Sequence, residues 1–134
     1  DTEMQEMVDM VREEEKPDAV IVLSHNGFDV DQKMAEVVTG IDFIMGGHTH
    51  DGVPEAYPAK NAKGVTYICN AGSNGKFLNV LDLDIQKGKI KDFKFTLLPI
   101  FSDLIPEDKE MKRYIESVRK PFEKDLNRVI ATTE

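Results

Sequence analysis

Two short apolar runs, each followed by a histidine, organise the first third of the chain. Residues 19–23 form a continuous and mostly β-branched run, and residues 43–45 form a shorter run that ends at two glycines. Between these runs, apolar residues recur at helical spacing: Val30, Met34, Val37 and Val38. Apolar strand, helix and apolar strand in this order predict a parallel βαβ unit.

Helices are predicted at both ends of the chain. Residues 2–15 carry apolar side chains at helical spacing, with charged residues opposite, and this pattern is typical of an amphipathic helix. Residues 107–126 show the same pattern, and Pro121 should kink this helix because proline removes a backbone N–H. Residues 128–134 show no pattern of their own.

The middle of the chain predicts a loop followed by strands. Residues 51–64 contain glycines and prolines and little apolar content, which indicates a loop. Three strands follow, at residues 65–70, 78–84 and 89–97. Because these strands are closely spaced in sequence, antiparallel pairing is expected among them, in contrast to the first half of the chain.

All three histidines follow the two strands of the βαβ unit. His25 comes after the first strand, and His48 and His50 come after the second. Open α/β sheets place their sites at the carboxyl ends of the strands, and imidazole is a common ligand of zinc, manganese and iron. Because His48 and His50 alternate with Thr49, an extended segment would point both the same way. The sequence therefore predicts a metal site, and ordinary loop histidines are the alternative.

The helix between the two histidine segments needs a cap at its start. Asp29 or Asp31 is expected to supply it, because aspartate is a preferred cap residue. A metal role for either carboxylate is the alternative, since both follow closely after His25.

Residues 71–76 form a polar, glycine-rich segment between two predicted strands. The spacing of a phosphate-binding P-loop is absent from it. A simple connection is one interpretation, and a second wall of the histidine site is the other, with Asn74 or Lys76 offering donors to an anionic substrate. Asn26, beside His25, is a further candidate for substrate binding.

Composition limits the possible partners. The chain of 134 residues fits one domain or a piece of one, and its net charge of −8 argues against a nucleic-acid partner. No apolar run approaches the roughly 20 residues of a membrane span, so no membrane partner is expected. The single cysteine, Cys69, excludes a disulfide within the chain and lies in a predicted strand, which indicates a buried structural thiol.

The histidines alone leave the number of metal ions open. Three histidines and a water can hold one zinc ion. A dinuclear hydrolytic site also needs carboxylates, and no further metal-ligand pattern follows His50. The remaining ligands of a dinuclear site would have to come from outside this chain.

The histidine segments resemble those of a known enzyme superfamily. SHNG followed by GGHTHD is similar to the second half of a calcineurin-like metallophosphoesterase domain, in the branch that holds bacterial 5′-nucleotidases. The stretches LSHNGFDVDQKMA, GIDFIMGGHTHDGVP, NAGSNGKFLNVLDLD and LLPIFSDLIPED resemble the SoxB family of sulfur-oxidation hydrolases. GGHTH is shared by the wider superfamily, whereas SHNGFDVD and AGSNGKFL favour SoxB.

The resemblance implies a fold, a site and a reaction. The fold would be α/β, part of a four-layer α/β/β/α sandwich. Two divalent ions would be bound, usually Mn²⁺ with Zn²⁺ possible, with His25 and His48 on one ion and His50 on the other. The parent enzyme would act in the periplasm and release sulfate from a thiosulfonate on the cysteine of a sulfur-carrier protein. A 5′-nucleotidase or other phosphoesterase, and a non-catalytic interaction domain, are the alternatives.

The chain lacks the family's upstream motifs, which are an Asp-x-His pair, a bridging Asp and an Asn-His pair. Residues 1–126 are therefore expected to be the C-terminal half of a metallophosphoesterase domain, and residues 127–134 the start of a linker to a further domain. The catalytic residues are expected upstream, so the fragment alone should be inactive. Half a sandwich should also expose apolar sheet, so we expect the fragment to self-associate.

Overall fold

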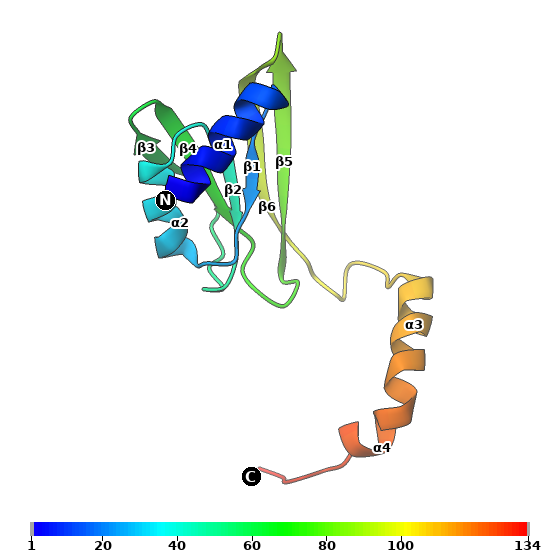
Figure 1. Cartoon of the computed structure of the whole chain (residues 1–134). Coiled ribbons are helices and arrows are strands. Elements are labelled where there is room, and N and C mark those ends of the chain that lie inside the picture. Colours follow the sequence, from blue (N-terminus) through cyan, green and yellow to red (C-terminus); the bar gives the residue numbers. More distant parts are fainter. Residues whose placement is uncertain (1, 134) are drawn as a thin grey trace. The chain divides into compact units, whose positions relative to one another are not determined.

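The computed structural model describes residues 2–133, which divide into two units at Ile100 and Phe101 (Figure 1). The first unit holds α1 (Thr2–Glu14), β1 (Ile21–Leu23), α2 (Phe28–Val37), β2 (Phe43–Gly46), β3 (Tyr57–Asn61), β4 (Gly64–Asn70), β5 (Phe77–Gln86) and β6 (Lys89–Pro99). The second unit holds α3 (Lys109–Arg119), a 3₁₀ turn (Lys120–Phe122) and α4 (Glu123–Leu126). Whether the domain itself ends at residue 126 stays a prediction.

The predicted βαβ unit is confirmed. β1 and β2 pair in parallel, with Ile21 opposite Phe43, and α2 forms the connection between them. The full sheet has the strand order β1-β2-β4-β3. The carboxyl ends of β1, β2 and β4 therefore lie at one edge, where both histidine segments begin.

Two expectations about the middle of the chain are wrong. The stretch 51–64 contains a strand, β3, which pairs antiparallel with β4 at the edge of the sheet. Pro58 is tolerated there because an edge strand has a free side. β4 is parallel to β2, because the long connection that contains β3 returns the chain to the start of the sheet. Of the three strands that the sequence predicts after residue 64, only β5 and β6 pair with each other, as the antiparallel hairpin that close spacing predicts.

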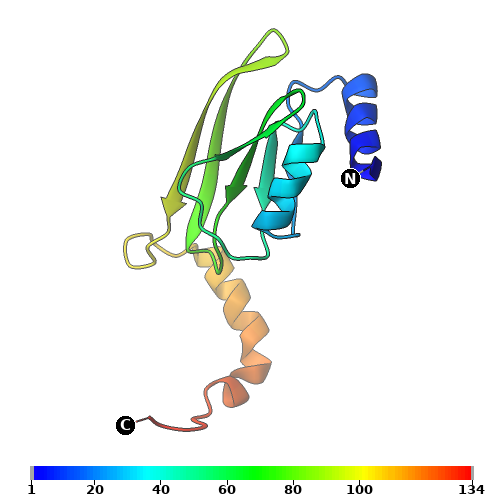
Figure 2. The same ribbon diagram turned by 90° about the vertical axis from the view of Figure 1, so that its left-hand side faces the viewer.

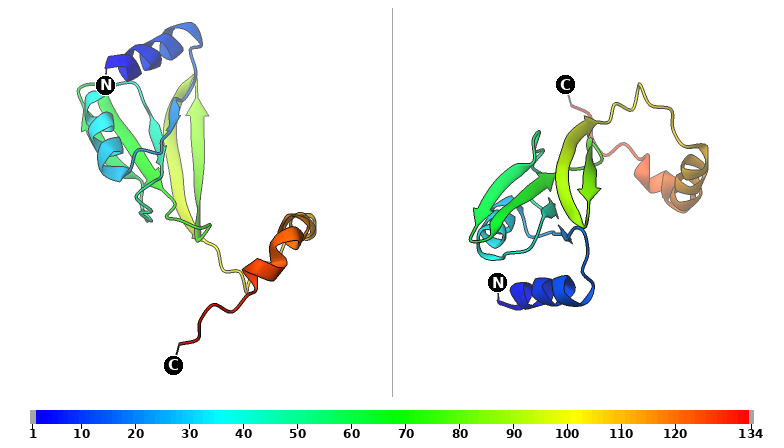
Figure 3. Two further views of the ribbon diagram at one scale, coloured as in Figure 1. Left: turned by 60° about the horizontal axis from the view of Figure 1, so that its bottom comes forward. Right: turned by 90° about the horizontal axis from the view of Figure 1, so that it is seen from above.

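The first unit has three layers. α1 and α2 cover one face of the four-stranded sheet, and the β5–β6 hairpin covers the other (Figures 2 and 3). Aromatic rings join the two sheets: the Phe93 ring lies 4.5 Å from the Tyr67 ring and 5.0 Å from the Phe43 ring, measured between centroids. The predicted α/β class, with a parallel unit followed by antiparallel strands, is confirmed.

The core between helices and sheet includes Ile44 and Ile68, both fully buried. The inner face of α2 differs from the expected one: Val30 and Val37 are exposed. The buried residues of α2 and its C-cap are Asp31, Met34, Ala35 and Val38, which keep the helical period. One member of this buried stripe is thus a carboxylate, which the apolar pattern alone does not show.

The second unit departs from the single long helix that the pattern predicts. Asp108 caps α3, since its Oδ1 accepts from the backbone N–H of Glu110 and of Met111 at 3.0 and 2.7 Å. α3 ends at Arg119, and Pro121 replaces the expected kink with a 3₁₀ turn, because its ring and missing N–H prevent a continuous helix. Among the described residues no helix has the length and apolar character needed to cross a bilayer.

Phe93→Ala should separate the hairpin from the four-stranded sheet. Removing this ring eliminates both aromatic contacts, so we expect a loss of about 3 kcal/mol in the free energy of unfolding. Urea denaturation measures this loss. Phe101→Ala, at an exposed phenylalanine, is the control and should change the value by less than about 0.5 kcal/mol. Equal losses in the two variants would contradict the layered packing.

Cys69 is buried as predicted, and burial raises the pKa of its thiol to about 11. The native protein should therefore resist thiol reagents at pH 8, whereas the unfolded chain reacts at once. Because burial penalises the thiolate, the contribution of this group to stability is full below about pH 9 and falls as the pH rises towards 11. Rapid labelling of Cys69 in the folded protein would contradict the burial of this thiol.

Candidate functional site

The histidines that follow β1 and β2 come together at the carboxyl edge of the sheet. The rings of His25 and His48 lie edge to face, with centroids 5.3 Å apart. Both side chains are exposed, as is His50. The backbone of the first loop is held to β2 by a hydrogen bond of 3.0 Å from the Ser24 N–H to the Met45 carbonyl.

Each loop packs against a glycine of the other loop. A Cβ added to Gly27, whose φ is 101°, would lie 2.9 Å from Thr49 Cγ2 and 3.7 Å from His48 Cδ2. A Cβ added to Gly47 would lie 3.2 Å from His25 Nδ1. Side chains at either glycine would push the loops apart, so their absence brings the two imidazoles together.

Thr49 joins the second loop to the start of α2. Its Oγ1 accepts a hydrogen bond of 3.2 Å from the Phe28 N–H, and its hydroxyl donates to the carboxylate of Asp51. The expectation that Asp29 or Asp31 caps α2 is therefore wrong. The cap comes from a residue distant in the sequence, which local patterns do not reveal.

The second loop is not extended. His48 and His50 have φ angles of 81° and 62°, in the left-handed region that residues other than glycine seldom adopt. The expectation that alternation directs both rings the same way rests on an extended segment and does not hold. Backbone strain of this kind persists only where the surroundings impose it, and it often marks functional loops.

As metal ligands, His25 and His48 fit one ion. Two imidazoles at this separation can present a nitrogen each, and imidazole suits zinc, manganese and iron. Within residues 2–133, no group of three or more His, Cys, Asp or Glu side chains is placed to hold a metal. The structure thus brings two of the predicted ligands together, and metal binding by His25, His48 and His50 stays a prediction.

The glycine-rich segment begins beside the second histidine loop. The Gly72 N–H donates to the Asp51 carbonyl at 2.8 Å, and Gly52 and Ala71 form a short bridge. Asn74 and Lys76 are exposed on the turn that follows. This placement is compatible with a second wall of the site, and the substrate-binding roles of both residues stay predictions.

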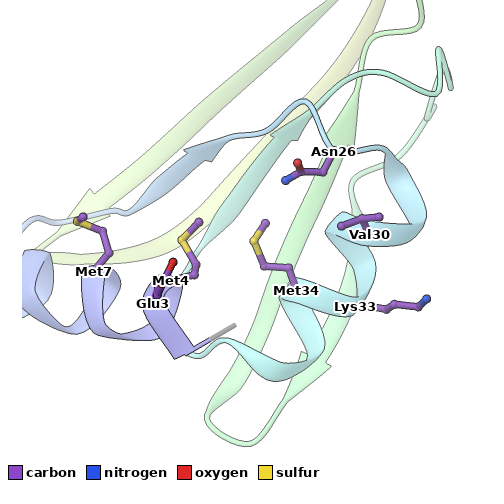
Figure 4. Close-up of a pocket in the computed structure, with 7 residues that line it drawn as sticks. All are labelled: Glu3, Met4, Met7, Asn26, Val30, Lys33 and Met34. Carbon is purple, nitrogen blue, oxygen red and sulfur yellow. The ribbon is translucent and has the colours of Figure 1, made fainter.

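Asn26 turns back onto its own loop. Its Nδ2 donates to Ser24 Oγ at 3.1 Å, and its side chain lines a groove of about 570 Å³ between α1 and α2 (Figure 4). Methionines form much of the groove wall: Met4, Met7 and Met34. None of the residues that line this groove is a predicted metal ligand, and the substrate-binding role of Asn26 stays a prediction.

Sequence reasoning missed a buried polar cluster beneath the loops. Asp31 and Asn70 are 0% and 1% exposed, and the Ser24 hydroxyl donates to Asp31 Oδ1. A Cβ added to Gly46 would lie 2.2 Å from Asn70 Oδ1 and 2.5 Å from Asp31 Oδ2. The available signal was the position of Asp31 on the helical period of Met34, three residues before it.

Known proteins resemble the chain over most of its length. It is 32% identical over 133 residues to the trifunctional nucleotide phosphoesterase protein YfkN of Bacillus subtilis, covering 97% of this chain and 9% of that protein. It is 27% identical over 124 residues to protein UshA of Yersinia enterocolitica, covering 74% of this chain and 22% of that protein. No family model matches.

Solved structures also resemble the chain over most of its length. The sulfate thiohydrolase SoxB of Thermus thermophilus superposes with a TM-score of 0.78 at 35% identity, over 90% of this chain and 21% of that one. A 5′-nucleotidase precursor, also of Thermus thermophilus, superposes with a TM-score of 0.83 at 25% identity, over 96% of this chain and 28% of that one.

Fold and sequence together support membership of this chain in the superfamily of metallophosphoesterases that includes the 5′-nucleotidases. Within that superfamily the chain resembles both SoxB and nucleotide phosphoesterases, and the comparisons do not single out SoxB. The nucleotide phosphoesterase, the sulfate thiohydrolase and the 5′-nucleotidase precursor bear the names of hydrolases, in agreement with the expected class. The chain spans less than a third of the length of each.

Gly27→Ala tests the contact between the two loops. The new methyl group meets Thr49 and the backbone has a positive φ, so we expect a loss of about 1–3 kcal/mol in stability. Gly64→Ala is the matched control, because a Cβ there meets nothing within 4 Å. Thermal unfolding compares them, and equal melting temperatures would contradict the proposed contact.

Proposed function

We propose that this chain is part of a metal-dependent hydrolase, in which His25 and His48 bind one divalent ion and His50 contributes to a second. The observation that carries the proposal is the approach of the His25 and His48 rings, 5.3 Å apart, at the ends of adjacent parallel strands. Because the chain spans 9–28% of the relatives described above, the activity of the whole protein is part of the proposal.

A pair of divalent ions, with Mn²⁺ or Zn²⁺ as the candidates, would supply Lewis-acid polarisation and an activated water. The residues of this chain would hold the ions, position the loops and bind the substrate. His25 and His48 hold their rings at the sheet edge, and Thr49 fixes the second loop against the start of α2. Lys76 and Asn74 would donate hydrogen bonds to anionic oxygens of the substrate.

As substrate we propose a thiosulfonate on the cysteine of a sulfur-carrier protein. Water oxygen would bond to the sulfonate sulfur while the sulfur–sulfur bond to it breaks. The electron pair of that bond would stay on the carrier, and the protons of water would be released with the sulfate. The 35% identity to the sulfate thiohydrolase, against 25% to the 5′-nucleotidase precursor, supports this substrate.

From the resemblance to the sulfate thiohydrolase we also propose a periplasmic location for the parent protein. One relative is named a 5′-nucleotidase precursor, which agrees with an exported enzyme. The carrier would be a second exported protein.

The test uses the complete protein that contains this chain, loaded with Mn²⁺ or Zn²⁺. A peptide bearing a cysteine thiosulfonate and 5′-AMP are supplied in separate assays for released sulfate and phosphate. We expect sulfate release, and His48→Ala should lower it by more than about 100-fold, since even residues that merely support a metal ligand are worth 10–100-fold. Lys60→Ala, on the edge strand β3, is the control and should retain activity.

Phosphate release without sulfate release would replace the thiosulfonate with a nucleotide and leave the metal site in place. The 32% identity to the nucleotide phosphoesterase makes this the rival substrate class. Full activity of His48→Ala towards both substrates would overturn the proposed hydrolase site.

A further inference from the structure

We propose that Asp31 is a positioning residue, which, with Ser24 and Asn70, fixes the ends of β1, β2 and β4 beneath His25 and His48. This inference rests on the proposed metal site and deepens it. None of the three residues is assigned to bind metal or substrate. Their role is to set the relative position of the two imidazoles.

The link to β1 runs through Ser24, which is the residue before His25. Its hydroxyl donates to Asp31 Oδ1, so the carboxylate on α2 holds the end of β1. Ser24 Oγ also accepts from the backbone N–H and the side chain of Asn26, at 3.3 and 3.1 Å. The first histidine loop is therefore hydrogen-bonded on both sides of His25.

The link to β2 and β4 runs past Gly46, two residues before His48. Gly46 is opposite Asn70 in the pairing of β2 with β4. Asn70 Oδ1 and Asp31 Oδ2 both lie within 2.5 Å of the point where a Cβ of Gly46 would be. Both side chains therefore occupy the space that glycine leaves, that of Asp31 from α2 and that of Asn70 from β4.

Several polar atoms of the cluster of Ser24, Asp31 and Asn70 lack hydrogen-bond partners in the described part of the chain, which indicates that the cluster is not there for packing alone. Asp31 Oδ2 and both side-chain polar atoms of Asn70 are buried, with no hydrogen-bond partner among the described residues. Unsatisfied buried polar atoms are costly, so apolar residues would serve packing better here. A half-turn of the Asn70 amide exchanges its donor and acceptor, so it can complement the carboxylate.

The electrostatics agree with a held, desolvated carboxyl. Burial raises the pKa of Asp31, while the hydrogen bond from Ser24 opposes this rise and the charge of Asp29 adds to it. A group that needs partners in this way restricts the geometry around it. A shift of the cluster would be transmitted to Ser24 and Gly46, and hence to both histidine loops.

The experiment measures Mn²⁺ affinity by calorimetry and the absorption spectrum of bound Co²⁺, on the complete protein. Asp31→Ala should lower the affinity about 10–100-fold, the usual effect of removing a residue that supports metal ligands. The Co²⁺ spectrum should change as well, because the ligand geometry changes. Asp31→Asn keeps an oxygen acceptor for Ser24 and should recover most of the affinity. Thermal unfolding without metal reports stability separately.

Glu36→Ala is the matched control, since it removes an exposed carboxylate from the same helix and should leave affinity and spectrum unchanged. An Asp31→Ala protein that is less stable but binds Mn²⁺ as the unmodified protein does would overturn the positioning role. If that variant does not fold, Asn70→Ala decides by the same two measurements. Absence of Mn²⁺ binding to the unmodified protein, or binding unaffected by His48→Ala, would instead overturn the proposed metal site.

Discussion

The close approach of the strand ends depends on three positions that carry no Cβ. Gly27 and Gly47 let each histidine loop rest on the backbone of the other, and Gly46 leaves room for the buried Asp31 and Asn70 side chains. An added methyl group at Gly46 would come within 2.5 Å of both polar groups, so the position excludes every other residue unless the cluster moves. The two histidine side chains can approach each other because these three positions at the edge of the sheet carry no side chain.

This constraint connects the fold to the proposed chemistry. Parallel pairing places the ends of β1, β2 and β4 side by side. A buried carboxylate on α2 accepts a hydrogen bond from Ser24, after β1, and lies beside Gly46, at the end of β2. The exposed imidazole of His25 is therefore attached to a loop that the buried Asp31 carboxylate holds through Ser24. Such support matters for a metal site because ligand orientation controls affinity as well as geometry. In the proposed site the two histidines would form part of a ligand set, and the chain spans less than a third of the relatives described above.

Much of the fold follows from the sequence pattern. Residues 19–23 and 43–45 predict the parallel unit, and the close spacing of β5 and β6 predicts their hairpin. The convergence of His25 and His48 follows from the same pattern. The parallel pairing of β4 does not, because it depends on how a long connection folds back. The capping by Thr49, and the approach of Asp31 and Asn70 to Gly46, bring together residues far apart in sequence. The left-handed backbone at His48 and His50 does not follow from the residue types either. The helical period indicates that Asp31 is buried, but no local signal indicates which residues lie beside it.

The most direct test of this account is anomalous diffraction at the manganese absorption edge, on crystals of the complete protein grown with Mn²⁺. The account predicts an anomalous peak within bonding distance of an imidazole nitrogen of His25 and of one of His48. Manganese bound elsewhere, or bound with neither of these two histidines, would contradict the central claim that the two loops form a metal site.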